Sequence, residues 1–162
     1  MIEWRRVRDF PGWSVSELGH IQNDLTGRVL KLRQNRQGIV MVGLLRGGDQ
    51  YTRSVAKLVA EAFVPSEHEA FDTLIYLNGD RGDIRASNLK WRTRPFAMQY
   101  HRMFDELPIR EGVYIPTTGE RFSSLREACT TYGLIESMAY RAMYRGEGVF
   151  PYGWLLEPIS DF

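Results

Sequence analysis

The chain has 162 residues, of which 43% are hydrophobic and 25% charged, a composition typical of one globular domain or two small modules. Its net charge of +1 excludes binding to polyanions through overall charge alone, and no apolar run approaches the roughly 18 residues of a membrane-spanning helix. The first ten residues lack an apolar signal-peptide core, and the single cysteine, Cys129, cannot form an internal disulfide. These features predict a cytoplasmic protein that makes no membrane contact.

Basic residues are concentrated near the start of the chain. Residues 1–60 hold 10 Lys or Arg against 5 Asp or Glu, a balance of +5, whereas residues 106–162 hold 5 against 8, a balance of −3. Nearly all the basic residues are arginines, which bind phosphates and base edges well but are also common in protein–protein contacts. The distribution predicts that any nucleic-acid contact is made mainly by the N-terminal part.

The first half of the chain predicts short strands, a helix and a loop. Two strand-like runs flank Gly47-Gly48, which is typical of a β-hairpin. Apolar residues then recur at helical spacing over 55–63, with Ser54 suited to cap this helix and Pro65 to end it. An apolar run over 74–77 and two turns follow, and Ser87 predicts the start of a short helix.

The second half predicts a connector over 95–111 and a separate pattern over 112–162. This pattern opens with two strands around a turn at 118–119 and closes with a terminal strand over 151–158. Between them, Ser124 and Glu127 form a capping box that predicts a helix ending at Gly133. A second helix is expected over 136–146. Two short helices joined by a glycine-containing turn are typical of a helix-turn-helix unit.

Several stretches resemble the HNH homing endonucleases of phages and group I introns. At the N-terminus the resemblance rests on Trp4, Gly12-Trp13, Val15-Ser16, Gly19 and Ile21. The segment SVAKLVAEAFVP resembles the start of the family's nuclease core, and LIYLNGDRGDIRASNLKW resembles its ββα-metal loop. The stretch from GERF to PYGW is similar to a C-terminal helix-turn-helix module. Together these segments cover residues 3–93 and 112–156.

The resemblance implies an α+β fold with four parts. These are an N-terminal β-rich module over 1–52 that binds DNA in the family, a degenerate ββα-metal core over 53–94, a connector over 95–111 and a helix-turn-helix module over 112–162. It also implies a phage-encoded protein acting in a bacterial cell.

The resemblance places apolar or aromatic residues where the family has its chemistry. The family's metal-binding position falls on Ile75 and its general base position on Tyr76. The two motif positions in the middle of the loop fall on Asp83-Ile84. Isoleucine cannot bind a hard cation, and tyrosine titrates near ~10, so it is protonated at neutral pH. Only Asn88 remains as a metal ligand, and one neutral amide does not hold Mg²⁺. The sequence therefore predicts no metal cofactor and no catalytic residue.

Other side chains near the loop offer an alternative metal site. Asp80 and Asp83 lie in the right place to capture Mg²⁺, but aspartate at these positions is also typical of turns, which we favour. The three histidines, His20, His68 and His101, lie outside the motif and are interpreted as structural or surface residues.

Candidate DNA contacts lie in both halves of the chain. A two-stranded ribbon over 28–51 has a width suited to the major groove. The second helix of the C-terminal module offers two arginines among acidic neighbours, which favours a protein contact as the alternative. The candidate residues are Arg5, Arg6, Arg28, Lys31, Arg33, Gln34, Arg36, Arg46, Arg141 and Arg145.

Three functions follow from these observations. The first is a catalytically inactive HNH relative that binds double-stranded DNA as a regulatory protein. The second is a modulator that binds a host protein, such as a nucleic-acid or defence enzyme, on the same scaffold. The third is an active nicking endonuclease with a rebuilt Mg²⁺ site.

Overall fold

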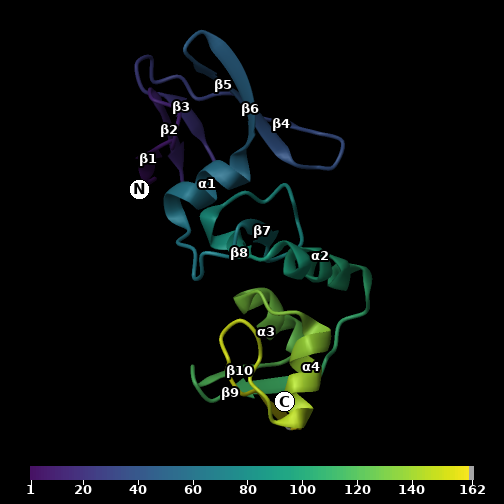
Figure 1. Cartoon of the computed structure of the whole chain (residues 1–162). Coiled ribbons are helices and arrows are strands. Elements are labelled where there is room, and N and C mark those ends of the chain that lie inside the picture. The colour runs from purple at the N-terminus through teal and green to yellow at the C-terminus, as the bar shows by residue number, and fades with distance from the viewer. Residues whose placement is uncertain (161–162) are drawn as a thin grey trace. The chain divides into compact units, whose positions relative to one another are not determined.

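The computed structural model describes residues 1–160 and divides the chain into two compact units, residues 1–93 and the residues from 94 onward (Figure 1). Each unit is built from small antiparallel sheets and short helices, so the described chain is a mixed α+β protein. Residues 1–52 and most of 53–94, expected as two modules, share one apolar core in the first unit. Val15, Val42, Val59 and Tyr76 all contribute to that core.

Two three-stranded antiparallel sheets form the first part of unit 1. One has the order β1-β2-β3 and consists of β1 (Trp4–Arg6), β2 (Trp13–Ser16) and β3 (Ile21–Asn23). The other has the order β4-β5-β6 and consists of β4 (Arg33–Gln34), β5 (Val40–Arg46) and β6 (Asp49–Ser54). The predicted hairpin turn joins β5 to β6, with positive φ at Gly47 (59°) and Gly48 (87°), as this kind of turn requires.

Strand β5 gives the second sheet a buried face and an open face. Val42 and Leu44 are buried in the core, and because successive side chains of a strand point in opposite directions, Met41 and Gly43 lie on the other face. Gln50 of β6 pairs opposite Leu45, so it lies on the open face as well. The sheet therefore presents one side to the core and one to solvent.

Helix α1 (Val55–Phe63) follows β6 as its apolar periodicity predicts. The Ser54 hydroxyl accepts a hydrogen bond from the Lys57 N–H at the start of the helix, and Val64 ends it just before Pro65. Strand β7 (Thr73–Tyr76) then pairs antiparallel with β8 (Leu89–Arg92). The two strands carry the loop over 77–88 between them.

The short helix expected from Ser87 does not extend past residue 88. Residues 86–88 form a single 3₁₀ turn, and Leu89 begins a strand whose partner is Tyr76 in β7. Pairing with β7 satisfies the backbone groups of residues 89–92, so this tertiary contact determines the structure rather than a local helix start.

The segment over 95–111, expected as a connector, is helical over its first half. Helix α2 (Arg94–Arg102) occupies that stretch and continues into a 3₁₀ turn over 103–105. Pro95 is compatible with the first turn of a helix, where its missing N–H has no partner to lose. Phe96, Ala97 and Tyr100 are buried and form the apolar stripe of the helix.

The remainder of unit 2 is a small sheet with two helices. Strands β9 (Gly112–Ile115), β10 (Glu120–Phe122) and β11 (Glu157–Ile159) form the sheet in the order β10-β9-β11. The terminal strand thus begins later than expected, after a turn closed by the Val149–Trp154 bridge. No helix within residues 1–160 is long and apolar enough to cross a membrane.

Helices α3 (Leu125–Tyr132) and α4 (Glu136–Arg145) are joined by the short turn over 133–135 (Figure 1). The Ser124 hydroxyl caps α3 by accepting from the Glu127 N–H. The Glu127 carboxylate accepts from the Ser123 hydroxyl, so the reciprocal half of the predicted capping box is replaced by a neighbouring serine. No side chain within residues 1–160 caps α4, and Gly133 and Gly146 end the two helices with left-handed backbone.

The β2–β3 turn packs directly on the loop that follows β7. A Cβ atom on Gly19 would lie 2.4 Å from Cδ1 of Ile84, and the Ala86 N–H donates to the Glu17 carbonyl at 2.8 Å. Gly19 also has φ +94°, a conformation that side chains disfavour. The missing side chain at Gly19 therefore makes room for Ile84.

Replacing Gly19 with alanine is expected to lower the free energy of unfolding of unit 1 by about 2–4 kcal/mol, because backbone strain adds to a steric clash. Gly12→Ala is the matched control, since Gly12 has φ +91° but nothing within 4 Å of its added Cβ. Urea denaturation of both variants separates the two terms. Equal losses in the two variants would show that the contact with Ile84 contributes nothing.

Candidate functional site

The loop over 77–88 is organised by two asparagines. Asn88 is buried, with its Oδ1 accepting from the Asn78 backbone N–H at 3.0 Å and its Nδ2 donating to the Asp83 carbonyl at 2.9 Å. Asn78 in turn donates from Nδ2 to the Asp83 carboxylate at 2.9 Å. The side chain at the last metal-ligand position is therefore engaged in closing the loop.

The two aspartates of the loop make turn interactions. Asp80 Oδ1 accepts from the Gly82 N–H at 2.8 Å, a contact that stabilises the turn. The Asp83 carboxylate accepts from Nε and Nη2 of Arg85 at 2.8 and 2.7 Å. This paired contact with Arg85 is the main cause that holds the pKa of Asp83 below its usual value.

The substitution Asp83→Asn tests this contact through its pH dependence. Because the pKa of Asp83 is depressed in the folded state, its ionic contact stabilises the fold above the ordinary pKa of ~4 and is lost as pH falls. We expect the variant to lose about 1 kcal/mol at pH 7 and much less at pH 3, measured by urea denaturation. Asp80→Asn, which keeps an oxygen for Gly82, is the control; a pH-independent loss for Asp83→Asn would contradict the assignment.

The positions assigned to the metal ligand and the general base lie inside the protein. Ile75 is 0% exposed and Tyr76 is 5% exposed. Burial raises the pKa of the Tyr76 hydroxyl above 10, and the charge of Arg81 only partly opposes this shift. Tyr76 therefore stays protonated throughout the neutral range and cannot accept a proton from water.

The residues of the loop do not fit the divalent cation that the resemblance implies. Such a cation needs several oxygen ligands, whereas Ile75 has none and the Asn88 oxygen already accepts a hydrogen bond. Asp80 and Asp83 also have partners in the turn. Within residues 1–160, no group of three His, Cys, Asp or Glu side chains is arranged to hold a metal ion.

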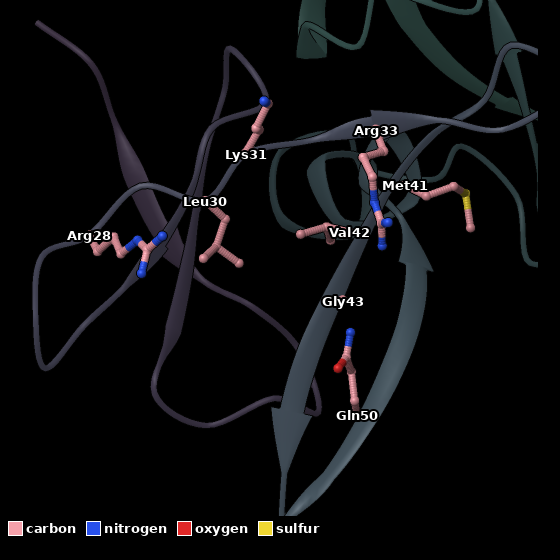
Figure 2. Close-up of a pocket in the computed structure, with 8 residues that line it drawn as sticks. All are labelled: Arg28, Leu30, Lys31, Arg33, Met41, Val42, Gly43 and Gln50. Atoms are coloured by element: carbon pink, nitrogen blue, oxygen red, sulfur yellow. The ribbon is translucent and has the colours of Figure 1, made fainter.

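Three of the candidate DNA contacts come together on unit 1. Arg28, Lys31 and Arg33 line a hollow with a volume of about 400 Å³ beside β5 (Figure 2). The other lining residues are Leu30, Met41, Val42, Gly43 and Gln50. Sequence reasoning missed Gly43 and Gln50. A glycine inside a strand, which often marks close approach of another group, was the available signal.

Two other candidate cations of unit 1 make contacts with other parts of that unit. Arg5 donates from Nη1 to the Ala62 carbonyl at 2.6 Å and lies over the Phe63 ring. Arg46 donates to the Asp9 carbonyl at 3.0 Å and its guanidinium stacks over two aromatic rings. These contacts orient both side chains along the protein surface.

The rest of the candidate set in unit 1 lies on its surface. Arg6 and Arg36 are exposed, and the exposed side chain of Gln34 donates to the Gly38 carbonyl at 3.3 Å within the β4–β5 turn. Next to this turn, Arg81 from the 77–88 loop donates to the Gln37 carbonyl at 3.1 Å. The β4–β5 turn and the loop over 77–88 are therefore tied together.

Arg141 and Arg145 lie on the exposed face of α4 in unit 2. They share that face with Tyr140 and Tyr144, whose ring centroids are 4.9 Å apart. The Tyr144 hydroxyl bonds to the Glu111 carboxylate, and this bond raises the pKa of Tyr144 to about 12. The face therefore combines two cations with an aromatic pair and a nearby carboxylate.

The relatives that the chain matches in sequence are named as endonucleases. No protein-family model matches the chain. It is 28% identical over 94 residues to the DNA endonuclease I-HmuI of Bacillus phage SP01, covering 57% of this chain and 53% of that protein. It is 27% identical over 91 residues to an uncharacterized HNH endonuclease of Acanthamoeba polyphaga mimivirus, covering 56% of this chain and 27% of that protein. The chain thus spans about half or less of the length of these curated relatives.

The fold has a counterpart among solved structures. The structure of the HNH homing endonuclease I-HmuI, described for DNA binding and cleavage, aligns with a TM-score of 0.58 and 19% sequence identity over 99% of both chains. At this identity the likeness establishes a shared fold. It agrees with the sequence matches, which name the same kind of protein.

Proposed function

We propose that the chain is a member of the HNH homing endonuclease family that binds double-stranded DNA without cutting it. The observation that carries this proposal is the burial of Ile75 and Tyr76 at the two positions where the family has its metal ligand and base. A phosphate cannot reach a metal or a base there. Removing both should abolish most of the rate enhancement of metal-assisted hydrolysis.

The surface of unit 1 supports the binding half of the proposal. Exposed cations are spread over the β4–β5–β6 sheet and the segment before it, and the loop over 77–88 is folded rather than lost. A protein of this kind acts by occupying a DNA site, as a regulator encoded by a phage and working in the bacterial cytoplasm. Mg²⁺ has no role in such binding.

Equilibrium binding to a duplex at several salt concentrations tests the proposed DNA binding. If the exposed residues Arg6, Arg28, Lys31, Arg33 and Arg36 each neutralise one phosphate, log K should fall against log salt with a slope of roughly −4.5. The absence of binding even at 50 mM salt would overturn the proposal.

Incubation of supercoiled plasmid with the protein and Mg²⁺ or Mn²⁺ tests the proposal that the protein does not cut DNA. We expect the plasmid to remain supercoiled. Asn88→Ala is the control that distinguishes the protein from a contaminating nuclease. Nicking by the wild type that disappears in Asn88→Ala would make the chain an active endonuclease with a rebuilt site.

A protein partner is the second candidate function, and unit 2 carries the observation that favours it. The exposed face of α4 has carboxylates nearby, including Glu111 bonded to Tyr144, which oppose the approach of phosphate. Tyrosine and arginine together are typical of protein interfaces. Recovery of a stoichiometric host protein, lost in Tyr140→Ala, would support this function over DNA binding.

A further inference from the structure

The hollow beside β5 has a composition that points to a ligand. Its charged lining residues are Arg28, Lys31 and Arg33, and no carboxylate from residues 1–160 lines it. Its volume of about 400 Å³ lies in the range of small-ligand sites. A site with three cations and no anion favours a ligand that carries phosphate.

The walls of the hollow differ from its rim. Leu30 and Met41 supply apolar surface, while the cations come from the segment before β4 and from β4 itself. Figure 2 shows Arg28, Leu30 and Lys31 on one side and Arg33 with Met41 on another, with Val42 and Gly43 between them. A ligand that fits must therefore combine an apolar group with flanking negative charges.

One amide reaches into this space from β6. Gln50 lies on the open face of the sheet, with its side-chain amide beside Gly43 (Figure 2). A Cβ atom added to Gly43 would lie only 2.2 Å from Nε2 of Gln50. Its side-chain amide makes no hydrogen bond to any of residues 1–160. The glycine thus allows a glutamine to lie flat across β5 with its donor and acceptor available.

We propose that this hollow reads one A·T base pair in the major groove of duplex DNA. The Gln50 amide pairs with N6 and N7 of adenine, the apolar wall contacts the thymine methyl group, and Arg28, Lys31 and Arg33 hold the flanking phosphates. The inference rests on the DNA binding proposed above. A G·C pair fits less well, because it has no methyl group for Leu30 and Met41 and presents no adenine-type edge to the amide.

A selection from random duplexes tests the inference with the full chain and its variants. Wild type should enrich a motif with one A·T pair that Gln50→Ala no longer prefers, a loss of about 5- to 150-fold in discrimination. Thr52→Ala is the matched control, since Thr52 is an exposed neighbour on the same face that does not line the hollow. Replacing the selected thymidine with deoxyuridine should weaken wild-type binding by removing the methyl group.

Substitutions of the lining cations should change DNA binding in a different way from Gln50→Ala. Arg28→Gln and Lys31→Gln should weaken binding to all sequences alike and reduce the salt slope by about one each. Melting followed by circular dichroism verifies that each variant is folded.

The possible outcomes separate the inference from the proposed function. Wild-type binding with the same preference in Gln50→Ala would overturn the inference and leave DNA binding intact. Failure of the wild type to bind any duplex would overturn both. Micromolar capture of free thymidine monophosphate, with indifference to duplex sequence, would make the hollow a mononucleotide site and overturn base-pair readout.

Discussion

Replacing Arg126 with methionine is expected to lower the free energy of unfolding of unit 2 by about 3–5 kcal/mol. Arg126 in α3 forms an ion pair with Glu136 at the start of α4, and the two side chains are only 17% and 6% exposed. Arg126 also donates to the carbonyls of Met103 and Glu106. Without it, a buried carboxylate loses its counter-charge and two carbonyls lose a donor.

Hydrogen exchange of the α3 and α4 amides measures this loss within unit 2. Arg141→Met is the control, because Arg141 is exposed on α4. The double variant Arg126→Met/Glu136→Gln should recover part of the loss, since a neutral amide can still accept from the Ile109 N–H, as Glu136 does at 2.9 Å. A loss below about 0.5 kcal/mol in Arg126→Met would mean that solvent already screens the pair.

The sequence predicted the elements that depend on neighbouring residues. The caps at Ser54 and Ser124 and the turn at Gly47-Gly48 are short-range features, and each lies where the local pattern places it. The strand over 89–92 was missed because its partner lies in β7, where each paired residue is 13 to 19 positions earlier in the chain. Helix α2 was missed because its few buried positions are spread among polar residues.

The candidate site could be predicted in its chemistry but not in its contacts. The residue types at 75 and 76 are visible in the sequence, and it follows from the side chains themselves that isoleucine offers no ligand atom and that tyrosine is protonated at neutral pH. That the Asn88 oxygen accepts from Asn78, and that Arg5 and Arg46 stack on aromatic rings, depends on the fold. Likewise, Gln50 gains its position only because β5 places Gly43 beneath it.

Introducing a polar metal ligand at position 75 is expected to lower the free energy of unfolding without producing nuclease activity. Ile75 is fully buried in β7, on the opposite side of the strand from Tyr76. Ile75→Asn removes buried apolar surface and adds an amide without an assured partner, which should cost about 2–5 kcal/mol. Equilibrium urea denaturation measures the loss, and Ile75→Val, expected to cost about 0.5–1.5 kcal/mol, separates volume from polarity.

The double variant Ile75→Asn/Tyr76→His completes the test, because it supplies an oxygen ligand at one position and an imidazole base at the other. We expect it to be less stable than either single variant and still unable to nick plasmid in Mg²⁺, since the Asn88 oxygen remains bonded to Asn78. A stable double variant that nicks would mean that two substitutions alone separate this chain from an active nuclease. The expected result instead means that Ile75 and Tyr76 stabilise the hairpin that carries the loop, so placing a metal ligand and a base at these positions would also require repacking of the core around both.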